Sequence, residues 1–218
     1  MKKTGILFLS LLITTISFSQ NAAKAKSLLE EVSIKMGAYK NMYIGFSQTL
    51  SNEDAGIKEG DEPPIRGAIN LQGEKYILNY LGNQFIYDGK KLHVINHDEK
   101  EVSISERDLG GNDGFIYPSK LLTFYKEGYN LQMGKTQNIK GRSIQFVTLN
   151  PIDSTSDIVK VELAIDVKTK HIYKLIQTGS NTSQTTFTIT EFKKNEDLSD
   201  SFFTFNKVKY LSQNYTID

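Results

Sequence analysis

Two histidines, His93 and His97, lie four residues apart and are followed by Asp98. Imidazole nitrogens and carboxylate oxygens are ligands that zinc accepts, so these residue types suit a metal site. The arrangement argues against such a site, because His97 falls in a predicted turn over residues 96–100 and the remaining histidine has no supporting spacing. The sequence therefore predicts no metal ion.

Other candidate catalytic or ligand-binding residues lack the partners that their chemistry requires. Asp153 and Asp157 share a loop, but that loop has neither the spaced oxygen ligands nor the glycine of a calcium-binding hand. Ser47 and Ser143 lack the second glycine of a nucleophile elbow. No glycine-rich segment ends in the Lys-Ser or Lys-Thr of a phosphate-binding loop. The sequence predicts a protein that is not an enzyme and uses no cofactor.

The composition is that of a soluble globular chain. Of the 218 residues, 39% are hydrophobic and 23% are charged, which differs from the composition of disordered chains. The formal net charge of +1 provides no general attraction to nucleic acid or to an anionic membrane. The absence of cysteine excludes disulfides, thiol catalysis and a lipid-anchored cysteine.

The first residues have the pattern of a secretory signal peptide. Lys2 and Lys3 form a basic region, residues 6–16 an apolar core, and residues 17–19 (Ser-Phe-Ser) a small-residue cleavage site. A membrane span is the alternative, but the apolar run is shorter than the roughly 20 residues that a bilayer requires. We predict a signal peptide over residues 1–19, a single mature domain over residues 20–218, and a periplasmic location.

Helical spacing of apolar residues follows this segment and stops near Gly37. It predicts an amphipathic helix whose charged residues occupy the opposite side and whose apolar stripe is Ala25, Leu28, Leu29, Val32 and Met36. A strand is predicted from Tyr43 to Leu50, with Ile44, Phe46 and Leu50 in phase. The polar stretch Ser51–Arg66 predicts an exposed loop, and both a solvated connection and a loop that contacts a partner fit its composition.

The stretch Gly67–Ile104 predicts a meander of short antiparallel strands. Apolar and polar residues alternate along it, as they do in a sheet with one apolar face. Asp88-Gly89 predicts a hairpin with a type I′ turn, because both residues tolerate a positive φ. Beyond it we predict a glycine-rich loop at 107–114, a short helix at 118–125, and strands near 129–133, 143–150, 161–165, 171–177, 185–189 and 202–205.

By these period rules, the sequence predicts about ten strands but only one long helix and one short helix. A flat sheet of that width leaves most of its apolar face in water. The sheet must therefore form a sandwich, close into a barrel, or curl around the helices. In the last case the helices leave part of the interior unfilled, and an apolar hollow of this kind suits a ligand.

Along the whole mature chain the sequence resembles the periplasmic outer-membrane lipoprotein carriers of the LolA family. The resemblance lies in the order and spacing of its landmarks. These follow the N-terminal amphipathic helix and are Phe46-Ser47-Gln48, Gly67-x-Ile69-x-Leu71, Lys75-Tyr76-x-Leu78, Tyr87-Asp88-Gly89-Lys90-x-Leu92, Pro118-x-x-Leu121-Leu122, Leu149-x-Pro151, Val161-x-Leu163-x-Ile165-Asp166 and Phe203-x-Phe205.

The resemblance implies a mainly β (α+β) fold: a curled antiparallel, unclosed β-barrel of about ten to eleven strands, with the N-terminal helix and a short second helix as a lid. It implies a monomeric carrier that shields lipoprotein acyl chains between an inner-membrane ABC transporter and an outer-membrane acceptor. The hypothesised cavity lining is Phe46, Ile69, Leu71, Tyr76, Leu78, Tyr80, Phe85, Tyr87, Leu92, Val94, Val161, Leu163 and Ile165. The hypothesised lid residues are Leu28, Leu29, Val32, Leu121, Leu122 and Phe124.

The chain departs from the family pattern in two places. Gln72-Gly73-Glu74 replaces a Lys-Arg-Pro turn whose arginine latches the lid in many members, and His93 stands where a tryptophan often follows the hairpin leucine. These differences favour one alternative, a module of the same fold that binds another lipid, a glycolipid or a lipid-linked pigment. A structural or interaction protein with a filled interior is a further alternative, and it predicts no binding of fatty acid.

Overall fold

The computed structural model describes the backbone of residues 4–106 and 122–218, and side chains from residue 20 onward within these ranges. The helix α1 (Thr4–Gly37) is continuous across the predicted cleavage site after Ser19, and cleavage there stays a prediction. Within the described residues, no helix is both long and apolar enough to cross a membrane.

Within the described residues, twelve strands form one sheet in the order β12-β6-β5-β4-β3-β2-β1-β11-β10-β9-β8-β7. All neighbours are antiparallel except β12 and β6, and the outermost strands β12 and β7 do not pair, so the barrel is unclosed. The strands are β1 (Met42–Ser51), β2 (Ile65–Gln72), β3 (Lys75–Tyr80), β4 (Asn83–Tyr87), β5 (Leu92–Asn96), β6 (Glu101–Ser105), β7 (Tyr129–Ile139), β8 (Arg142–Pro151), β9 (Ile158–Asp166), β10 (Ile172–Gly179), β11 (Gln184–Lys194) and β12 (Thr216–Ile217).

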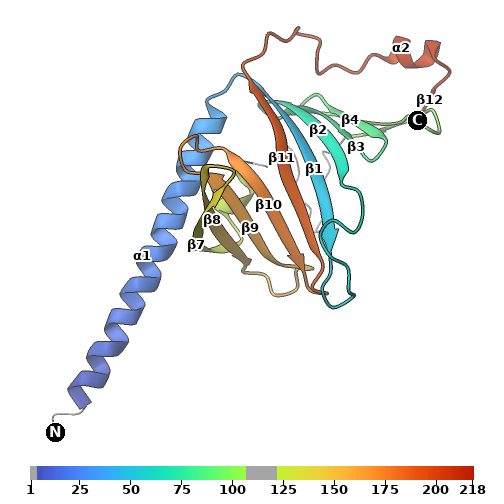
Figure 1. Ribbon diagram of the computed structural model, residues 1–218. Helices are drawn as coiled ribbons and strands as arrows, with labels where there is room; N and C mark the ends of the chain where they lie inside the picture. The colour runs from blue at the N-terminus through green and yellow to red at the C-terminus, as the bar shows by residue number, and fades with distance from the viewer. Residues whose placement is uncertain (1–3, 107–121) are drawn as a thin grey trace.

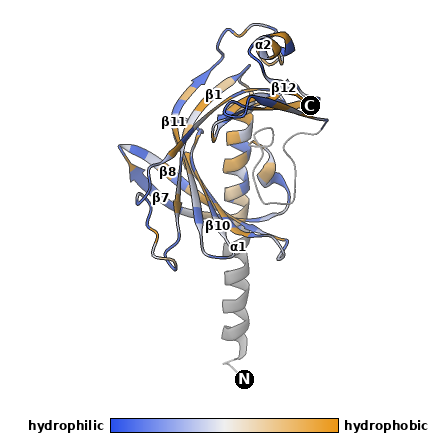
Figure 2. Ribbon diagram, turned by 90° about the vertical axis from the view of Figure 1, so that its right-hand side faces the viewer, coloured by the Kyte–Doolittle hydropathy of each residue, from blue (hydrophilic) through white to orange (hydrophobic). Residues whose placement is uncertain are grey.

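The sheet curls around the C-terminal half of α1, which lies in its concave side (Figure 1). Figure 2 shows hydrophobic residues along this half of the helix, which lies beside the curled sheet. Ala25, Leu28, Leu29, Val32 and Met36 are each at most 7% exposed, as the helical spacing predicted. The predicted curled, mainly β fold with an N-terminal helix is therefore confirmed.

The predicted hairpin around Asp88-Gly89 is confirmed, but the prediction of a type I′ turn is wrong. Gly89 has a φ of +95°, whereas Asp88 is not among the residues with positive φ. The carboxylate Oδ1 of Asp88 instead accepts hydrogen bonds of 2.8 Å from the backbone N–H groups of Lys90 and Lys91. The Asp88 side chain thus bonds the backbone N–H groups of the turn. The loop has four residues rather than the two of a type I′ hairpin.

The C-terminal end differs most from the sequence prediction. No strand forms at residues 202–205, where the chain turns. A short helix, α2 (Lys207–Ser212), follows, and β12 then pairs with β6. The observed strand count exceeds the predicted ten to eleven because β12 adds to the edge of the sheet.

The C-terminal segment covers the convex face of the β3–β6 region. Ile86, Ile95 and Val102 alternate with the residues that face α1, and they form a separate buried cluster with Tyr210. Phe205 packs against this second cluster. The sheet therefore has two apolar layers here, one under α1 and one under the C-terminal segment.

Candidate functional site

The concave face of the sheet gathers all thirteen residues of the hypothesised cavity lining into one apolar cluster with α1. Eight of them are buried, at no more than 5% exposure: Ile69, Leu71, Tyr76, Leu78, Leu92, Val161, Leu163 and Ile165. The other five are only partly buried and pack against that core: Phe46, Tyr80, Phe85, Tyr87 and Val94. The apolar face thus extends beyond the part that is fully covered.

The hypothesised lid residues on α1 lie against this face. Leu28, Leu29 and Val32 are buried in the same cluster. Leu122 and Phe124 are partly buried against it, and Leu121 lies outside the described residues. In the described part of the predicted second helix, a 3-10 turn forms over η2 (Phe124–Lys126).

The side chains of Asn21, Lys170 and Tyr125 hold α1 in place through polar contacts that sequence reasoning missed. The Asn21 side chain accepts a hydrogen bond from the backbone N–H of Met133 (2.5 Å) and donates one to its carbonyl oxygen (3.5 Å). Lys170 forms an ion pair of 2.7 Å with Glu31. The Tyr125 hydroxyl donates a hydrogen bond to the helix backbone. Met133 is on the edge strand β7, so Asn21 also satisfies backbone groups that an edge leaves unpaired.

Hollows lie on the flanks of α1. One of about 220 Å³ is bordered by Met36 of the helix, Leu71 and Gly73 on or beside β2, and Leu122. Another, of about 330 Å³, lies further toward the N-terminus of the helix and is bordered by Leu28, Glu31, Met133 and Lys170. Both are grooves at the edges of the helix, and the side chains directly beneath α1 are closely packed.

An aromatic wall of Phe46, Tyr80 and Phe187 forms part of the partly covered face. The ring centroid of Phe46 lies 5.7 Å from that of Tyr80 and 5.9 Å from that of Phe187. The Phe46 ring also lies over Gly67 of the neighbouring strand, where a Cβ atom would come within 2.3 Å of it. Glycine at this position allows the ring to lie close to the sheet.

Tyrosine hydroxyls at the apolar face remain neutral at physiological pH. Burial raises the pKa of Tyr80, Tyr125 and Tyr129 above the ordinary value of a phenol. Such groups supply hydrogen bonds without introducing charge.

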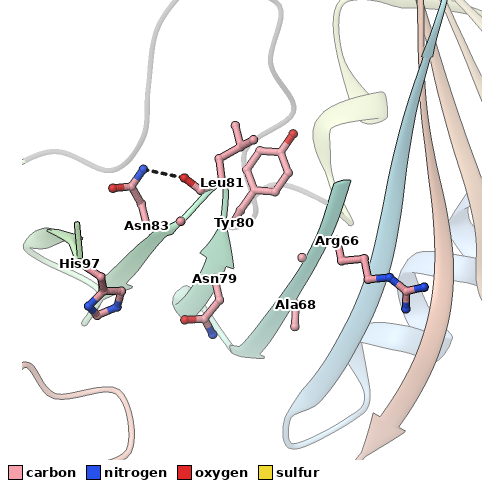
Figure 3. A pocket seen from close by; sticks show the side chains of 9 residues that line it. Arg66, Ala68, Asn79, Tyr80, Leu81, Asn83 and His97 are labelled. Atoms are coloured by element: carbon pink, nitrogen blue, oxygen red, sulfur yellow. Dashed lines mark hydrogen bonds between the residues drawn. The ribbon is translucent and has the colours of Figure 1, made fainter. Parts of the chain in front are cut away.

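A hollow of about 460 Å³ lies at the ends of strands β2, β3 and β4 (Figure 3). Arg66 and Ala68 come from β2, Asn79 and Tyr80 from β3, and His97 from the turn after β5. In Figure 3, Tyr80 points away from the side on which Asn79 and His97 lie. The hollow shares Tyr80 with the aromatic wall.

The histidines of the candidate metal site have other partners. His93 is stacked on Phe205 at a centroid distance of 4.3 Å on the convex face. His97 lies in the predicted turn, and its Nδ1 atom is 2.9 Å from the Tyr215 hydroxyl. Among the described residues, no three histidine, aspartate or glutamate side chains converge as a metal site requires.

Comparisons with known proteins find similarity in structure but not in sequence. No family model and no curated protein matches the chain. An uncharacterised conserved protein from Thermus thermophilus has a similar structure, with a TM-score of 0.60 at 9% identity, over 89% of this chain and 98% of that one. The structural neighbours include LolA superfamily proteins.

Two of these neighbours show the extent of the similarity. An outer membrane lipoprotein-sorting protein domain from Vibrio parahaemolyticus has a TM-score of 0.48 at 14% identity, over 84% of this chain and 97% of that one. A LolA superfamily protein from Nitrosomonas europaea has a TM-score of 0.41 at 14% identity, over 83% and 97%. The likeness to the Thermus thermophilus protein, at 9% identity, is one of fold.

Proposed function

We propose that this protein is an exported carrier of amphiphilic lipid, which holds acyl chains on the concave face in the place of α1. The observation that supports this most strongly is the concave face itself. It is apolar, α1 covers part of it together with Leu122 and Phe124, hollows lie at the flanks of the helix, and the aromatic wall is only partly buried.

The energies of the two possible occupants are similar. Each CH₂ group removed from water stabilises a bound chain by about 0.8 kcal/mol, so one long acyl chain contributes on the order of 10 kcal/mol before ordering costs. Each large apolar side chain that α1 buries contributes about 1.5–3 kcal/mol, so its stripe also contributes on the order of 10 kcal/mol. Cargo can therefore displace the helix, and the helix can displace cargo at the site of release.

For the cargo, we propose the acyl chains of lipoproteins, carried by a monomer across the periplasm. An inner-membrane ABC transporter would load them and an outer-membrane acceptor would receive them. The sequence landmarks shared with the carrier family support this choice, and the mature protein would be residues 20–218. No catalytic step, metal ion or cofactor is part of the proposal.

A second candidate cargo is a free lipid, a glycolipid or a lipid-linked pigment. The turn Gln72-Gly73-Glu74 favours it, because this turn lacks the latch arginine and its Gly73 borders the hollow beside the end of α1. Mass spectrometry of material that stays bound after gentle purification from the exporting cell separates the two. Co-purified lipoproteins support the first cargo and free lipids the second, whereas protein without any bound or bindable lipid contradicts both.

A covalent cross-link between α1 and the turn that joins β9 and β10 tests whether lipid displaces the helix. The chain has no cysteine, so a Glu31→Cys/Lys170→Cys pair can be bridged specifically with a short, reductively cleavable bis-maleimide across the ion pair. We expect the bridged protein to lose binding of a fluorescent fatty acid and to regain it after cleavage.

The matched control is a Lys91→Cys/Glu106→Cys pair, which replaces an ion pair of 2.8 Å within the β5–β6 region and does not involve α1. Bridging this pair should leave binding unchanged. If the helix-bridged protein binds the fatty acid as well as the control does, lipid does not take the place of α1.

A further inference from the structure

Gln48 is a buried polar residue within the apolar concave face. Alternation along β1 places it on the same face as Ile44 and Phe46, and its cross-strand neighbours are Ile65 on β2 and Phe187 on β11. Its exposure is 9%, and its Oε1 atom has no hydrogen-bond partner. Buried polar atoms are nearly always paired, so this carbonyl oxygen is an exception that calls for an explanation.

The position of Gln48 along β1 is informative. Ile44 is 3% exposed under α1, Phe46 is partly buried, and Leu50 at the end of the strand is 49% exposed. Gln48 therefore lies between the aromatic wall and the open end of the concave face. An amphiphile whose chain lies on the wall and under the helix would have its polar end near this side chain.

We propose that Gln48 is a recognition residue for cargo, and this inference rests on the proposed lipid-carrier function. Its Oε1 atom accepts a hydrogen bond from an N–H or O–H group at the polar end of an acyl chain. The preferred ligand class is then an acyl chain that carries such a donor, as in an N-acyl amide or a hydroxylated acyl chain. Chains joined through a plain ester leave the Gln48 oxygen unpaired and bind more weakly.

A pair of ligands that differ at one atom tests this assignment. N-palmitoylglycine methyl ester contains an amide N–H, and its analogue with oxygen in place of that N–H is an ester of the same length. Displacement of a fluorescent fatty acid gives both affinities. We expect the wild-type protein to bind the amide about fivefold more tightly, the size of one net hydrogen bond. Methyl 3-hydroxypalmitate, compared with methyl palmitate, shows whether a hydroxyl serves as donor too.

The variant Gln48→Met removes the acceptor and keeps a side chain of similar length. We expect it to bind the amide and the ester within twofold of each other. The matched control is Gln72→Met on β2, where alternation places Gln72 on the opposite face from Leu71. This control should keep the fivefold preference. In wild-type protein labelled with ¹⁵N, the Gln48 carboxamide resonances should shift with the amide and much less with the ester.

The outcomes separate this inference from the function on which it rests. If the wild-type protein binds amide and ester equally, Gln48 does not select cargo, while the carrier function stands. The same conclusion follows if Gln48→Met retains the preference. If neither ligand displaces the probe and the probe itself does not bind, the proposed function fails and this inference fails with it.

Discussion

The Tyr125 hydroxyl donates a hydrogen bond of 2.9 Å to the backbone carbonyl oxygen of Leu29, in the buried part of α1. Tyr125 is 3% exposed and Leu29 is 1% exposed, so the bond is shielded from water. Burial raises the pKa of the Tyr125 hydroxyl, and the group therefore stays protonated and able to donate at neutral pH. Two segments far apart in the sequence are thereby joined over the concave face.

The variant Tyr125→Phe tests whether this bond holds α1 closed. It should lower the free energy of unfolding by about 1 kcal/mol, the usual net contribution of one hydrogen bond. Because lipid no longer has to break the bond to displace the helix, affinity for a fluorescent fatty acid should rise by up to about fivefold. Urea denaturation and fluorescence titration measure the two effects, which have opposite signs.

A matched control for this variant is Tyr173→Phe, which removes a hydroxyl from a residue beside the small convex cluster near Arg142. Its affinity for fatty acid should equal that of the wild-type protein. Weaker binding by Tyr125→Phe than by wild type would mean that Tyr125 supports the bound state rather than the closed one.

The contact between Phe46 and Gly67 gives a second prediction. Gly67→Ala places a methyl group within 2.3 Å of the Phe46 ring, so the ring must move. Overpacking costs about 1–3 kcal/mol, and we expect the low end of this range because the ring is only partly buried. In a Phe46→Ala background the same substitution should cost almost nothing.

Urea denaturation of the four proteins in this double-mutant cycle gives the coupling energy, expected at about 1 kcal/mol. Equal costs of Gly67→Ala in both backgrounds would show that strain elsewhere, and not the Phe46 ring, is responsible.

Periodic patterns predicted the parts of the fold that depend on local sequence. The helical spacing through Leu28 and Val32 and the alternation through Ile69 and Leu71 each report which side of an element is buried, and the structure confirms both. Alternation also places Gln48 between Phe46 and Leu50 on the inner face. Its position was therefore available from sequence, although the missing hydrogen-bond partner was not.

Features that depend on distant contacts were not predictable in this way. Residues 202–205 are rich in aromatics, a composition that predicted a strand. Phe205 instead packs on His93 and Tyr210 over the convex face, outside any strand. The role of Asn21 depends on Met133 lying in an edge strand, which only the strand order reveals. Leu50 was predicted in phase with the core, yet it is exposed because it lies near the end of β1, at the open end of the face.

Histidine burial predicts how stability depends on pH. Burial, the largest cause, lowers the pKa of His93 and of His171. For His93, a hydrogen bond with the Ile86 backbone and the charge of Asp88 oppose the shift without reversing it, while Lys91 adds to it. In the unfolded chain these residues have a pKa of about 6.5. As the pH falls, the unfolded state therefore takes up protons before the folded state does.

The free energy of unfolding should therefore be highest above about pH 7 and should decrease as the pH falls below about 6.5, until the folded histidines are protonated as well. Urea denaturation between about pH 5.5 and 7.5 measures this slope. His93→Phe should reduce the slope, since one of the two contributing groups is removed. An unchanged slope in this variant would assign the dependence to other groups.

The two apolar layers of the sheet should be functionally separable. Tyr210 is 3% exposed under the C-terminal segment, where it stacks on Phe205 and its hydroxyl donates a hydrogen bond of 2.8 Å to Gln84. Tyr210→Ala should lower the free energy of unfolding by about 3 kcal/mol, as expected for a buried aromatic residue. It should leave fatty-acid affinity unchanged under conditions where the variant is folded, because the convex cluster does not include the residues beneath α1. A loss of affinity in the folded variant would show that lipid binding involves both layers.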